Sequence, residues 1–383
     1  MKWARVKEGE TELSVPDISL RTPEPPTSPV FFNPAAELNR DVSVAVVRAT
    51  KGSTFCDALA GVGARGVRVA NEAGRELKVS MVDFNELSLS AAKRNAGING
   101  VSSRCEFVGG EANAYLFTRF RRTEKFDYVD VDPFGTPVSH LQAALNATAD
   151  GGLVSVTATD TAVLCGVYPG VSRRRYSAST AKGDYCHETG VRILANACRR
   201  VAGSLDLGAF PVLAHCTRHY VRVYLRVEVG ASRADAALEN EGYVAECPSC
   251  GERFATRERP TRCENCDGRL SVAGPLWVGP LVDEGLLKRA TKASGERARL
   301  LLSSLRDLNH FPPYGYDVSS VSSALRLPGV SPAVVADELR LNGFRWGTQP
   351  FEKKGLKTDA SYAEVADAVT RASSRNRSNT ARR

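Results

Sequence analysis

Short apolar runs alternate with segments of helical periodicity between residues 53 and 159, and this rhythm predicts a doubly wound α/β sheet. The predicted strands lie near residues 53–57, 79–83, 105–108, 126–132 and 153–159. Apolar residues at helical spacing then predict a helix over 191–201, followed by a closing antiparallel pair over 210–215 and 220–229. Upstream, a helix is expected over 35–49, whereas the polar, proline-rich residues 1–30 predict an irregular leader.

The composition changes at about residues 230–241, and we place a domain boundary there. Residues 1–235 are expected to form one domain and residues 236–383 a second, because 383 residues exceed one ordinary core. In the second part, helical signals span 284–308, and residues 317–346 predict two short helices of a small helical or winged-helix-like module. The basic, serine-rich residues 371–383 predict a disordered tail.

One face of the last predicted strand carries an unusual set of polar and aromatic side chains. Because side chains alternate along a strand, this face is formed by Tyr220, Arg222, Tyr224 and Arg226. The ordinary expectation for such a face is a solvated sheet edge.

A glycine-rich turn follows the first predicted strand and precedes a helix expected over residues 65–73. Gly61, Gly63 and Gly66 fit G-x-G-x-x-G, in which glycines permit a tight turn and a close approach of the backbone to a ligand. The next strand ends in Asp83, at the spacing expected for a carboxylate that binds a ribose. A nucleoside is therefore expected at the carboxyl ends of the strands, and an NAD-type oxidoreductase would also fit these features.

Two further features favour S-adenosylmethionine over a dinucleotide. Asp57 precedes the first glycine by four residues, where a carboxylate suits the cationic end of this donor and repels a pyrophosphate. The other feature is Asp132-Pro133-Phe134-Gly135, at the end of the fourth predicted strand. There Asp132 can accept hydrogen bonds from an exocyclic amine, Pro133 can present its carbonyl at a set angle, and Phe134 offers a stacking face. Asp-Pro turns are common, so this stretch alone would be weak evidence for a substrate site. It becomes informative because the glycine-rich turn precedes it in the sequence.

Four of the ten cysteines form the spacing C-x2-C-x12-C-x2-C, namely Cys247, Cys250, Cys263 and Cys266. Four thiolates at this spacing predict a closed, structural zinc site, with paired disulfides or plain buried thiols as the alternatives. The remaining cysteines lie in largely apolar contexts and are expected to be small buried hydrophobic residues. They are Cys56, Cys105, Cys165, Cys186, Cys198 and Cys216.

The charge balance favours a polyanionic partner, because 51 basic and 43 acidic residues give a net charge of +8 and a pI near 9.0. The basic run of residues 173–175 could contact such a partner or belong to a solvated loop. The sequence has no apolar run long enough to span a bilayer and no apolar signal-peptide region. We therefore expect a cytoplasmic protein without membrane association, and a monomer.

Taken together, these features resemble the tRNA (guanine26-N2)-dimethyltransferase family in its archaeal form, over nearly the whole chain. Beyond the glycine-rich turn, the Asp-Pro-Phe-Gly stretch and the cysteines, the resemblance rests on residues 32–41, 174–176, 187–188, 219–222 and 357–359. Many methyltransferases that modify exocyclic amines carry Asn/Asp-Pro-Pro followed by Tyr or Phe at the substrate site. The second proline is missing here, which argues against the common DNA-adenine type.

The resemblance implies a class I methyltransferase (Rossmann-like) domain, followed by a tRNA-binding domain with the zinc module at about residues 244–270. It implies transfer of one or two methyl groups from S-adenosylmethionine to N2 of guanosine 26 in tRNA. Asp132, Pro133 and Phe134 would then hold the base. The alternative from another class is a non-catalytic, zinc-containing RNA-binding protein with a donor-binding fold.

The resemblance also implies a set of donor contacts. They are Arg40, Arg65, Asp83, Glu111 and the backbone of Ala112, and they add to Asp57, Gly61 and Gly63. Glu111 often corresponds to Asp in the family, a conservative departure that keeps a carboxylate for the adenine amine. The number of methyl groups, modification of a neighbouring guanosine and preferences among tRNAs stay open.

Overall fold

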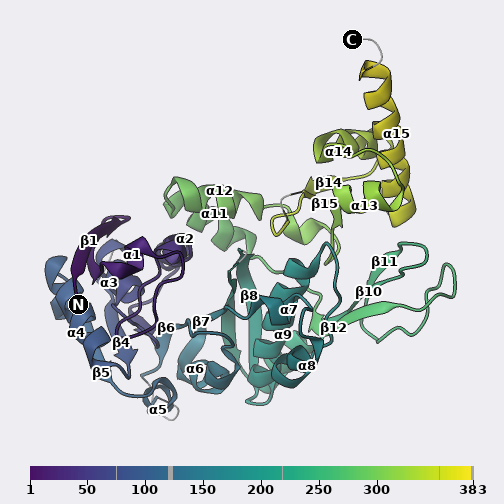
Figure 1. Cartoon of the computed structure of the whole chain (residues 1–383). Helices are drawn as coiled ribbons and strands as arrows, with labels where there is room; N and C mark the ends of the chain where they lie inside the picture. Colours follow the sequence, from purple (N-terminus) through teal and green to yellow (C-terminus); the bar gives the residue numbers. More distant parts are fainter. Residues whose placement is uncertain (75, 120–123, 218, 353, 381–383) are drawn as a thin grey trace.

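The structure, a computed structural model, describes residues 1–74, 76–119, 124–217, 219–352 and 354–380. A seven-stranded sheet forms its centre, in the order β5-β4-β3-β6-β7-β9-β8 (Figure 1). The first five of these strands are parallel, and β9 runs antiparallel between β7 and β8. The strands are β3 (Thr54–Asp57), β4 (Lys78–Asp83), β5 (Cys105–Gly109), β6 (Phe126–Val131), β7 (Thr148–Ala158), β8 (Leu207–Cys216) and β9 (Val221–Val229). The predicted α/β class is confirmed, as are the five strands and the closing antiparallel pair.

Helices connect these strands and cover the sheet (Figure 1). They are α2 (Glu37–Ala49), α3 (Ala64–Glu72), α4 (Glu86–Ile98), α5 (Ala112–Phe117), α6 (Leu141–Ala147), α7 (Thr161–Leu164), α8 (Pro169–Tyr176) and α9 (Cys186–Gly203). From β3 the chain builds outward through β4 and β5 and then returns to the other side of β3 with β6. The carboxyl ends of β3 and β6 therefore meet at the topological switch point, where open α/β sheets bind ligands.

The first residues form an ordered hairpin, so the prediction of an irregular leader is wrong for this part. Strand β1 (Trp3–Glu8) pairs antiparallel with β2 (Thr11–Pro16), and the short helix α1 (Ile18–Arg21) follows. Leu13 and Val15 are buried in one hydrophobic cluster with residues of the glycine-rich turn and α4. Ser14 between them is also buried, so the burial does not follow a regular two-residue period of apolar residues in the sequence.

The C-terminal part contains two small antiparallel sheets, ordered β11-β10-β12 and β13-β15-β14. Their strands are β10 (Glu241–Glu246), β11 (Arg253–Thr256), β12 (Ser271–Trp277), β13 (Tyr316–Asp317), β14 (Trp346–Thr348) and β15 (Gly355–Thr358). The helices are α10 (Ala231–Leu238), α11 (Glu284–Ala293), α12 (Glu296–Ser304), α13 (Val318–Ala324), α14 (Pro332–Leu341) and α15 (Tyr362–Thr380). Helices α11 and α12 pack against α2, and the last three helices enclose a separate core (Figure 1). The boundary between residues 235 and 236 stays a prediction.

The prediction of a disordered tail is wrong for residues 371–380, which belong to helix α15. It runs to Thr380, and residues 381–383 lie outside the described part of the chain. Val365, Ala368, Val369 and Ala372 recur at helical spacing and are buried in the C-terminal core. This apolar face stabilises the helix in spite of its basic end. No helix in the described ranges combines the length and apolar character needed to cross a membrane.

A buried ion pair joins the sheet domain to the C-terminal core. Glu188 of α9 and Lys357 of β15 are both fully buried, and Lys357 Nζ lies 2.7 Å from Glu188 Oε2. Gln349 and Arg192 donate further hydrogen bonds to the same carboxylate. Burial lowers the pKa of Lys357 to about 8, although Glu188 opposes this shift. For Glu188, burial acts to raise the pKa, but Lys357 and Arg192 outweigh it and hold that pKa below its ordinary value.

We expect the Lys357→Met variant to lose about 3–5 kcal/mol of unfolding free energy, because it leaves a buried carboxylate with one cation fewer. Chemical denaturation monitored by circular dichroism measures this loss. The matched control is Arg345→Met, which breaks an exposed pair with Asp359 on the same small sheet. It should cost less than about 1 kcal/mol. Equal losses in the two variants would contradict a special role for the buried pair.

Candidate active site

The turn between β3 and α3 lies at the switch point and requires glycine. Gly61 and Gly63 have φ values of 54° and 72°, a conformation that residues with a Cβ rarely adopt. A Cβ on Gly66 would lie 2.6 Å from Cγ of Met81, so a larger residue would push α3 away from β4. The predicted glycine-rich turn is present, and it brings backbone to the carboxyl edge of the sheet.

Asp83, the last residue of β4, holds this turn in place. Its Oδ2 accepts a hydrogen bond from the backbone N–H of Gly61 at 2.8 Å, and its Oδ1 accepts one from Asn85 at 2.8 Å. Each carboxylate oxygen keeps a second lone pair that can accept a ribose hydroxyl. The geometry therefore suits the predicted role of Asp83 in donor binding, which stays a prediction.

Asp57 ends β3 and is buried beneath the glycine-rich turn. Its Oδ2 accepts a hydrogen bond from the backbone N–H of Gly66 at 3.0 Å. Burial and then the charge of Asp130 raise the pKa of Asp57 to about 7, against the opposing effect of Arg65. The negative charge beneath the turn therefore changes with pH close to neutrality.

Two aspartates at the end of β6 share one arginine. The Nε atom of Arg65, in α3, lies 3.1 Å from Oδ1 of Asp130, and the same guanidinium contacts the carboxylate of Asp132. Asp130 is fully buried, whereas 25% of the Asp132 side chain is exposed. Of the two carboxylates, only that of Asp132 is within reach of a substrate, and this supports its assignment over Asp130.

Arg222 of β9 holds Asp130 from the other side. Its guanidinium contacts Asp130 and also donates a hydrogen bond to Thr157 Oγ1 at 2.5 Å. Burial acts to raise the pKa of Asp130, but Arg222 and Arg65 outweigh it and lower that pKa. The two arginines and two aspartates form one charge network at the carboxyl edge of the sheet.

Arg222 is not among the predicted site residues, and the expectation of a solvated edge is wrong for its position. Strand β9 lies inside the sheet, between β7 and β8, and both Arg222 and Tyr224 are buried. The available signal was the position of Arg222 between Val221 and Val223, at the more apolar end of the predicted strand. Without the strand order, that signal could not be assigned to the interior.

The Asp-Pro-Phe-Gly stretch forms an exposed turn beyond β6. Phe134 is 61% exposed and packs edge to face on Phe31, with ring centroids 4.7 Å apart. Gly135 has a φ of 73°, and its N–H donates a hydrogen bond to Thr159 Oγ1 at 2.6 Å. The aromatic face of Phe134 is thus available next to the carboxylate of Asp132, as the stacking hypothesis requires.

Arg40 lies behind the turn, and its guanidinium is already engaged. It is buried, its Nε donates a hydrogen bond to Glu8 Oε2 at 2.7 Å, and it also bonds the backbone carbonyl of Asn33 at 3.0 Å. Glu8 belongs to the N-terminal hairpin, which the sequence did not predict. A donor contact of Arg40 stays a prediction, and it would have to share the guanidinium with Glu8.

Glu111 and Ala112 lie beyond β5, at the start of α5. A carboxylate oxygen of Glu111 accepts a hydrogen bond from the backbone N–H of Ala114 at 2.7 Å and so caps the helix. Glu111 is exposed and Ala112 is buried. Strand β5 is two strands away from β3, so this pair belongs to the outer end of the carboxyl edge.

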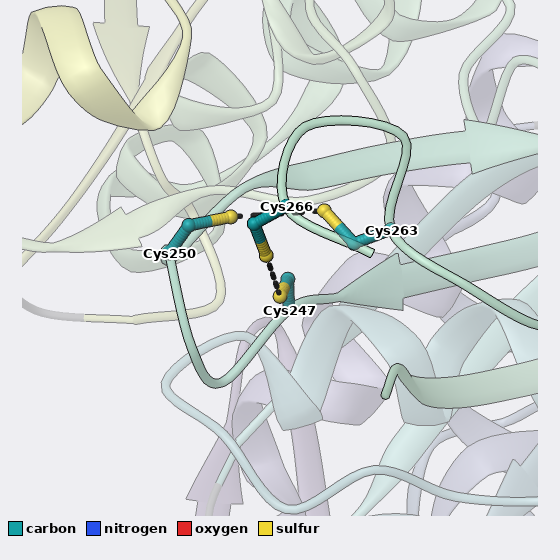
Figure 2. Close-up of side chains that lie close together, drawn as sticks. All are labelled: Cys247, Cys250, Cys263 and Cys266. Carbon is teal, nitrogen blue, oxygen red and sulfur yellow. Dashed lines mark hydrogen bonds between the residues drawn. The ribbon is translucent and has the colours of Figure 1, made fainter. Parts of the chain in front are cut away.

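The four predicted zinc ligands converge from two loops of the β10–β12 sheet (Figure 2). The Sγ atoms of Cys247 and Cys266 are 3.4 Å apart, and those of Cys250 and Cys263 are 3.7 Å apart. Tetrahedral zinc with Zn–S bonds of about 2.3 Å requires sulfur separations of about 3.8 Å. The separations therefore fit one ion held by four thiolates.

The backbone of the two loops repeats the same hydrogen bonds. The N–H of Gly251 donates to the carbonyl of Cys247, and the N–H of Asp267 donates to the carbonyl of Cys263, both at 2.8 Å. Gly251 and Asp267 also share positive φ values, of 80° and 55°. Each loop is a tight knuckle that aims its two sulfurs at a common point, which favours metal binding over separately buried thiols.

A cavity of about 730 Å³ lies at the opposite edge of the sheet. Its lining includes Lys51, Asp127, Gly151 and Arg289, which lie at or near the amino ends of the strands or on α11. None of the predicted site residues lines it. The candidate site is therefore the carboxyl edge and not this cavity.

Comparisons with known proteins identify similar chains over almost the whole sequence. A family model described as N2,N2-dimethylguanosine tRNA methyltransferase matches residues 9–370. A tRNA (guanine(26)-N(2))-dimethyltransferase of Methanosarcina acetivorans is 34% identical over 95% of this chain and 97% of its own length. The corresponding protein of Methanopyrus kandleri is 35% identical over 97% of both chains.

A solved structure extends the likeness to the fold. It is the complex of Trm1 from Pyrococcus horikoshii with S-adenosyl-L-methionine, which is 28% identical. It matches with a TM-score of 0.82 over 95% of this chain and 99% of its own. Because the family model spans most of the sequence and the relatives match over nearly their whole length, the chain belongs to the N2,N2-dimethylguanosine tRNA methyltransferase family.

Proposed function

We propose that the chain transfers one or two methyl groups from S-adenosylmethionine to N2 of guanosine 26 in tRNA. The observation that carries this proposal is the position of Asp132 beside Pro133 and the exposed Phe134, at the switch point of the sheet. The family and the relatives named above support both the reaction and the substrate. The chain is expected to act in the cytoplasm as a monomer.

The reaction requires acceptors for the hydrogens of the guanine amine. The N2 lone pair is delocalised into the ring, so N2 is a poor nucleophile until that lone pair is localised. Asp132 and the carbonyl of Pro133 accept hydrogen bonds from the two N–H groups of the amine and direct the lone pair toward the methyl group. When bound, the donor supplies an electrophilic methyl group on a sulfonium that leaves as a neutral thioether. Asp132 then takes the proton that N2 releases and passes it to solvent.

Arg65 positions Asp132 for this task. Its guanidinium bridges Asp132 and the buried Asp130, and it also bonds Asn39 Oδ1 at 2.8 Å and Ser43 Oγ at 2.5 Å. An arginine fixed by so many partners has little freedom to move. It therefore presents the Asp132 carboxylate in one orientation before the base arrives, which lowers the cost of aligning the base.

The donor fits the groups along the carboxyl edge. We propose that Asp83 accepts the ribose hydroxyls, that Glu111 and the Ala112 backbone bind adenine, and that Gly61 and Gly63 let the backbone come close. Asp57, Arg65 and Arg40 would face the charged methionine end. Arg65 could bind the donor carboxylate only by sharing its guanidinium between that carboxylate and Asp132.

Substrate RNA would be held by basic side chains outside the crevice. Arg173 and Arg174 on α8 are exposed, and Arg175 pairs with Asp160 at 2.9 Å just beyond β7. We infer that this helix and the C-terminal domain contact tRNA phosphates, while the target base flips toward Phe134. Zinc in the four-cysteine site would serve structure, since four thiolates leave no open position for a substrate.

Incubation of the chain with tRNA and methyl-labelled S-adenosylmethionine tests the proposed function. Mass spectrometry of the digested nucleosides should find label in N2-methylguanosine and N2,N2-dimethylguanosine. A tRNA with adenosine at position 26 should take up no label at that position. Label confined to a ring nitrogen, or uptake that ignores the identity of position 26, would overturn the assignment.

The Asp132→Asn variant should slow methyl transfer by about a hundredfold or more, because it removes the proton acceptor. Single-turnover kinetics measure the transfer rate, and calorimetry measures donor affinity, which should change little. Asp127→Asn is the control, because Asp127 lies at the other end of β6, where its carboxylate accepts hydrogen bonds from the backbone N–H groups of Ser53 and Thr54. A near-normal rate for Asp132→Asn would remove Asp132 from the reaction.

Affinity for S-adenosylmethionine should rise as the pH increases through about 7, the raised pKa of Asp57. Below that pH Asp57 is protonated and neutral, and above it the carboxylate attracts the cationic groups of the donor. Calorimetric titrations at a series of pH values measure this dependence. The Asp57→Asn variant should lack this rise, and an equal rise in that variant would show that another group is responsible.

A further inference from the structure

Residues 166–168 form a corner between α7 and α8 that exposes an aromatic ring (Figure 1). Val167 is 51% exposed and Tyr168 is 56% exposed. Among the described residues, no side chain stacks on the Tyr168 ring or hydrogen-bonds to its hydroxyl group. Single exposed apolar side chains are common, but the backbone, the charge and the position of this corner all point to a ligand.

The backbone of the corner is held in one conformation. Gly166 has a φ of 84°, which residues with a Cβ rarely adopt. The N–H of Val167 donates a hydrogen bond to the carbonyl of Ala162 at 2.9 Å, and the carbonyl of Tyr168 accepts bonds from two N–H groups in the first turn of α8. Pro169 then fixes its own φ. The aromatic ring is therefore presented from an ordered backbone, which reduces the entropy that a ligand contact would cost.

Positive charge surrounds the corner. Arg173 and Arg174 are exposed and share one face of α8 with Gly170, because residues three and four apart lie side by side on a helix. Neither arginine pairs with a carboxylate of the residues that the structure describes. Lys182 is exposed as well, and its backbone lies against the corner. The nearby Asp160 is largely covered and already paired within α8. A ligand of this surface should therefore be anionic.

Helix α8 is joined to the turn that carries Phe134. Thr159 donates its N–H to the carbonyl of Gly135 at 2.8 Å and accepts the N–H of Gly135 on its Oγ1 at 2.6 Å. Asp160, the next residue, accepts a hydrogen bond from the Tyr176 hydroxyl at 2.6 Å, at the end of α8. The eight residues of α8 span about 12 Å, and a stacked strand of nucleic acid advances about 3.4 Å per nucleotide. The corner at the other end of α8 is thus only a few nucleotides away from the target base.

We propose that Tyr168 stacks on an unpaired base of the substrate RNA a few nucleotides from the target guanosine, while Arg173 and Arg174 contact the adjoining phosphates. This inference rests on the proposed function. A base that leaves the stack deprives its neighbours of a stacking partner, and an exposed aromatic ring can cover a base face whatever the identity of that base. Tyr168 is therefore a positioning residue that holds the RNA while the target base is turned out. An RNA strand also supplies the negative charge that the exposed cations require.

Binding measurements with tRNA test the role of the ring. The Tyr168→Ala variant should bind tRNA about five- to a hundredfold more weakly, whereas Tyr168→Phe should bind like the parent. Loss of the ring should leave the salt dependence of binding unchanged, because stacking releases no counterions. The double variant Arg173→Ala/Arg174→Ala should instead reduce that dependence. Leu300→Ala is the control, because it removes an exposed apolar side chain from α12, and it should change neither property.

Ultraviolet cross-linking tests the contact itself. The probe is tRNA with 5-bromouridine introduced singly at positions within four nucleotides of guanosine 26. Mass spectrometry of the digested complex should find a cross-link to Tyr168 in the parent and none at position 168 in Tyr168→Ala. Cross-linking without methyl transfer would support the RNA contact and count against the proposed function alone. Normal methyl transfer, with no cross-link to Tyr168 and parental tRNA affinity in Tyr168→Ala, would overturn this inference and leave the proposed function standing.

Discussion

The bridge that Arg65 makes between Asp130 and Asp132 is the interaction on which the candidate site depends. Asp130 is fully buried, and a buried carboxylate is tolerated only with partners. Arg222 from β9 and Arg65 from α3 supply those partners, and α2 adds Asn39 and Ser43. Elements far apart in the sequence are therefore held at one point by one network. Asp132 is the member of that network that solvent reaches. Because folding already orients its carboxylate, the reaction does not require further free energy for that orientation.

The same principle holds where the two parts of the chain meet. Glu188 is buried among Lys357, Gln349 and Arg192, which come from both sides of the junction. One residue earlier in α9, His187 contacts Glu352 from the C-terminal side. The junction thus depends on specific polar pairs in addition to the packing of α11 and α12 on α2. A bound tRNA that touches both parts would meet a surface whose halves are already fixed relative to each other.

Local patterns in the sequence predict much of the fold and part of the site, because they depend on neighbouring residues only. The parallel strands, the glycine-rich turn, Asp83 and the cysteine knuckles were all predictable from spacing. The N-terminal hairpin was not, since its buried residues include the polar Thr11 and Ser14, and its Glu8 is stabilised by Arg40 from α2. Arg222 and the terminal helix were missed for the same reason: strand order and the packing of the C-terminal core decide their burial. When two residues far apart in the sequence pair in the fold, the sequence around either one does not indicate its partner.

The central claim is that Asp132, held by Arg65, accepts the amine of the target guanine. A crystal structure of the chain with S-adenosylhomocysteine and a tRNA tests this most directly. It should place N2 of guanosine 26 within about 3 Å of both the Asp132 carboxylate and the Pro133 carbonyl, with the base on Phe134. The bridge from Arg65 to Asp130 should be unchanged. A base bound with its amine away from Asp132, or an Asp132 carboxylate that contacts only protein in the complex, would contradict the account.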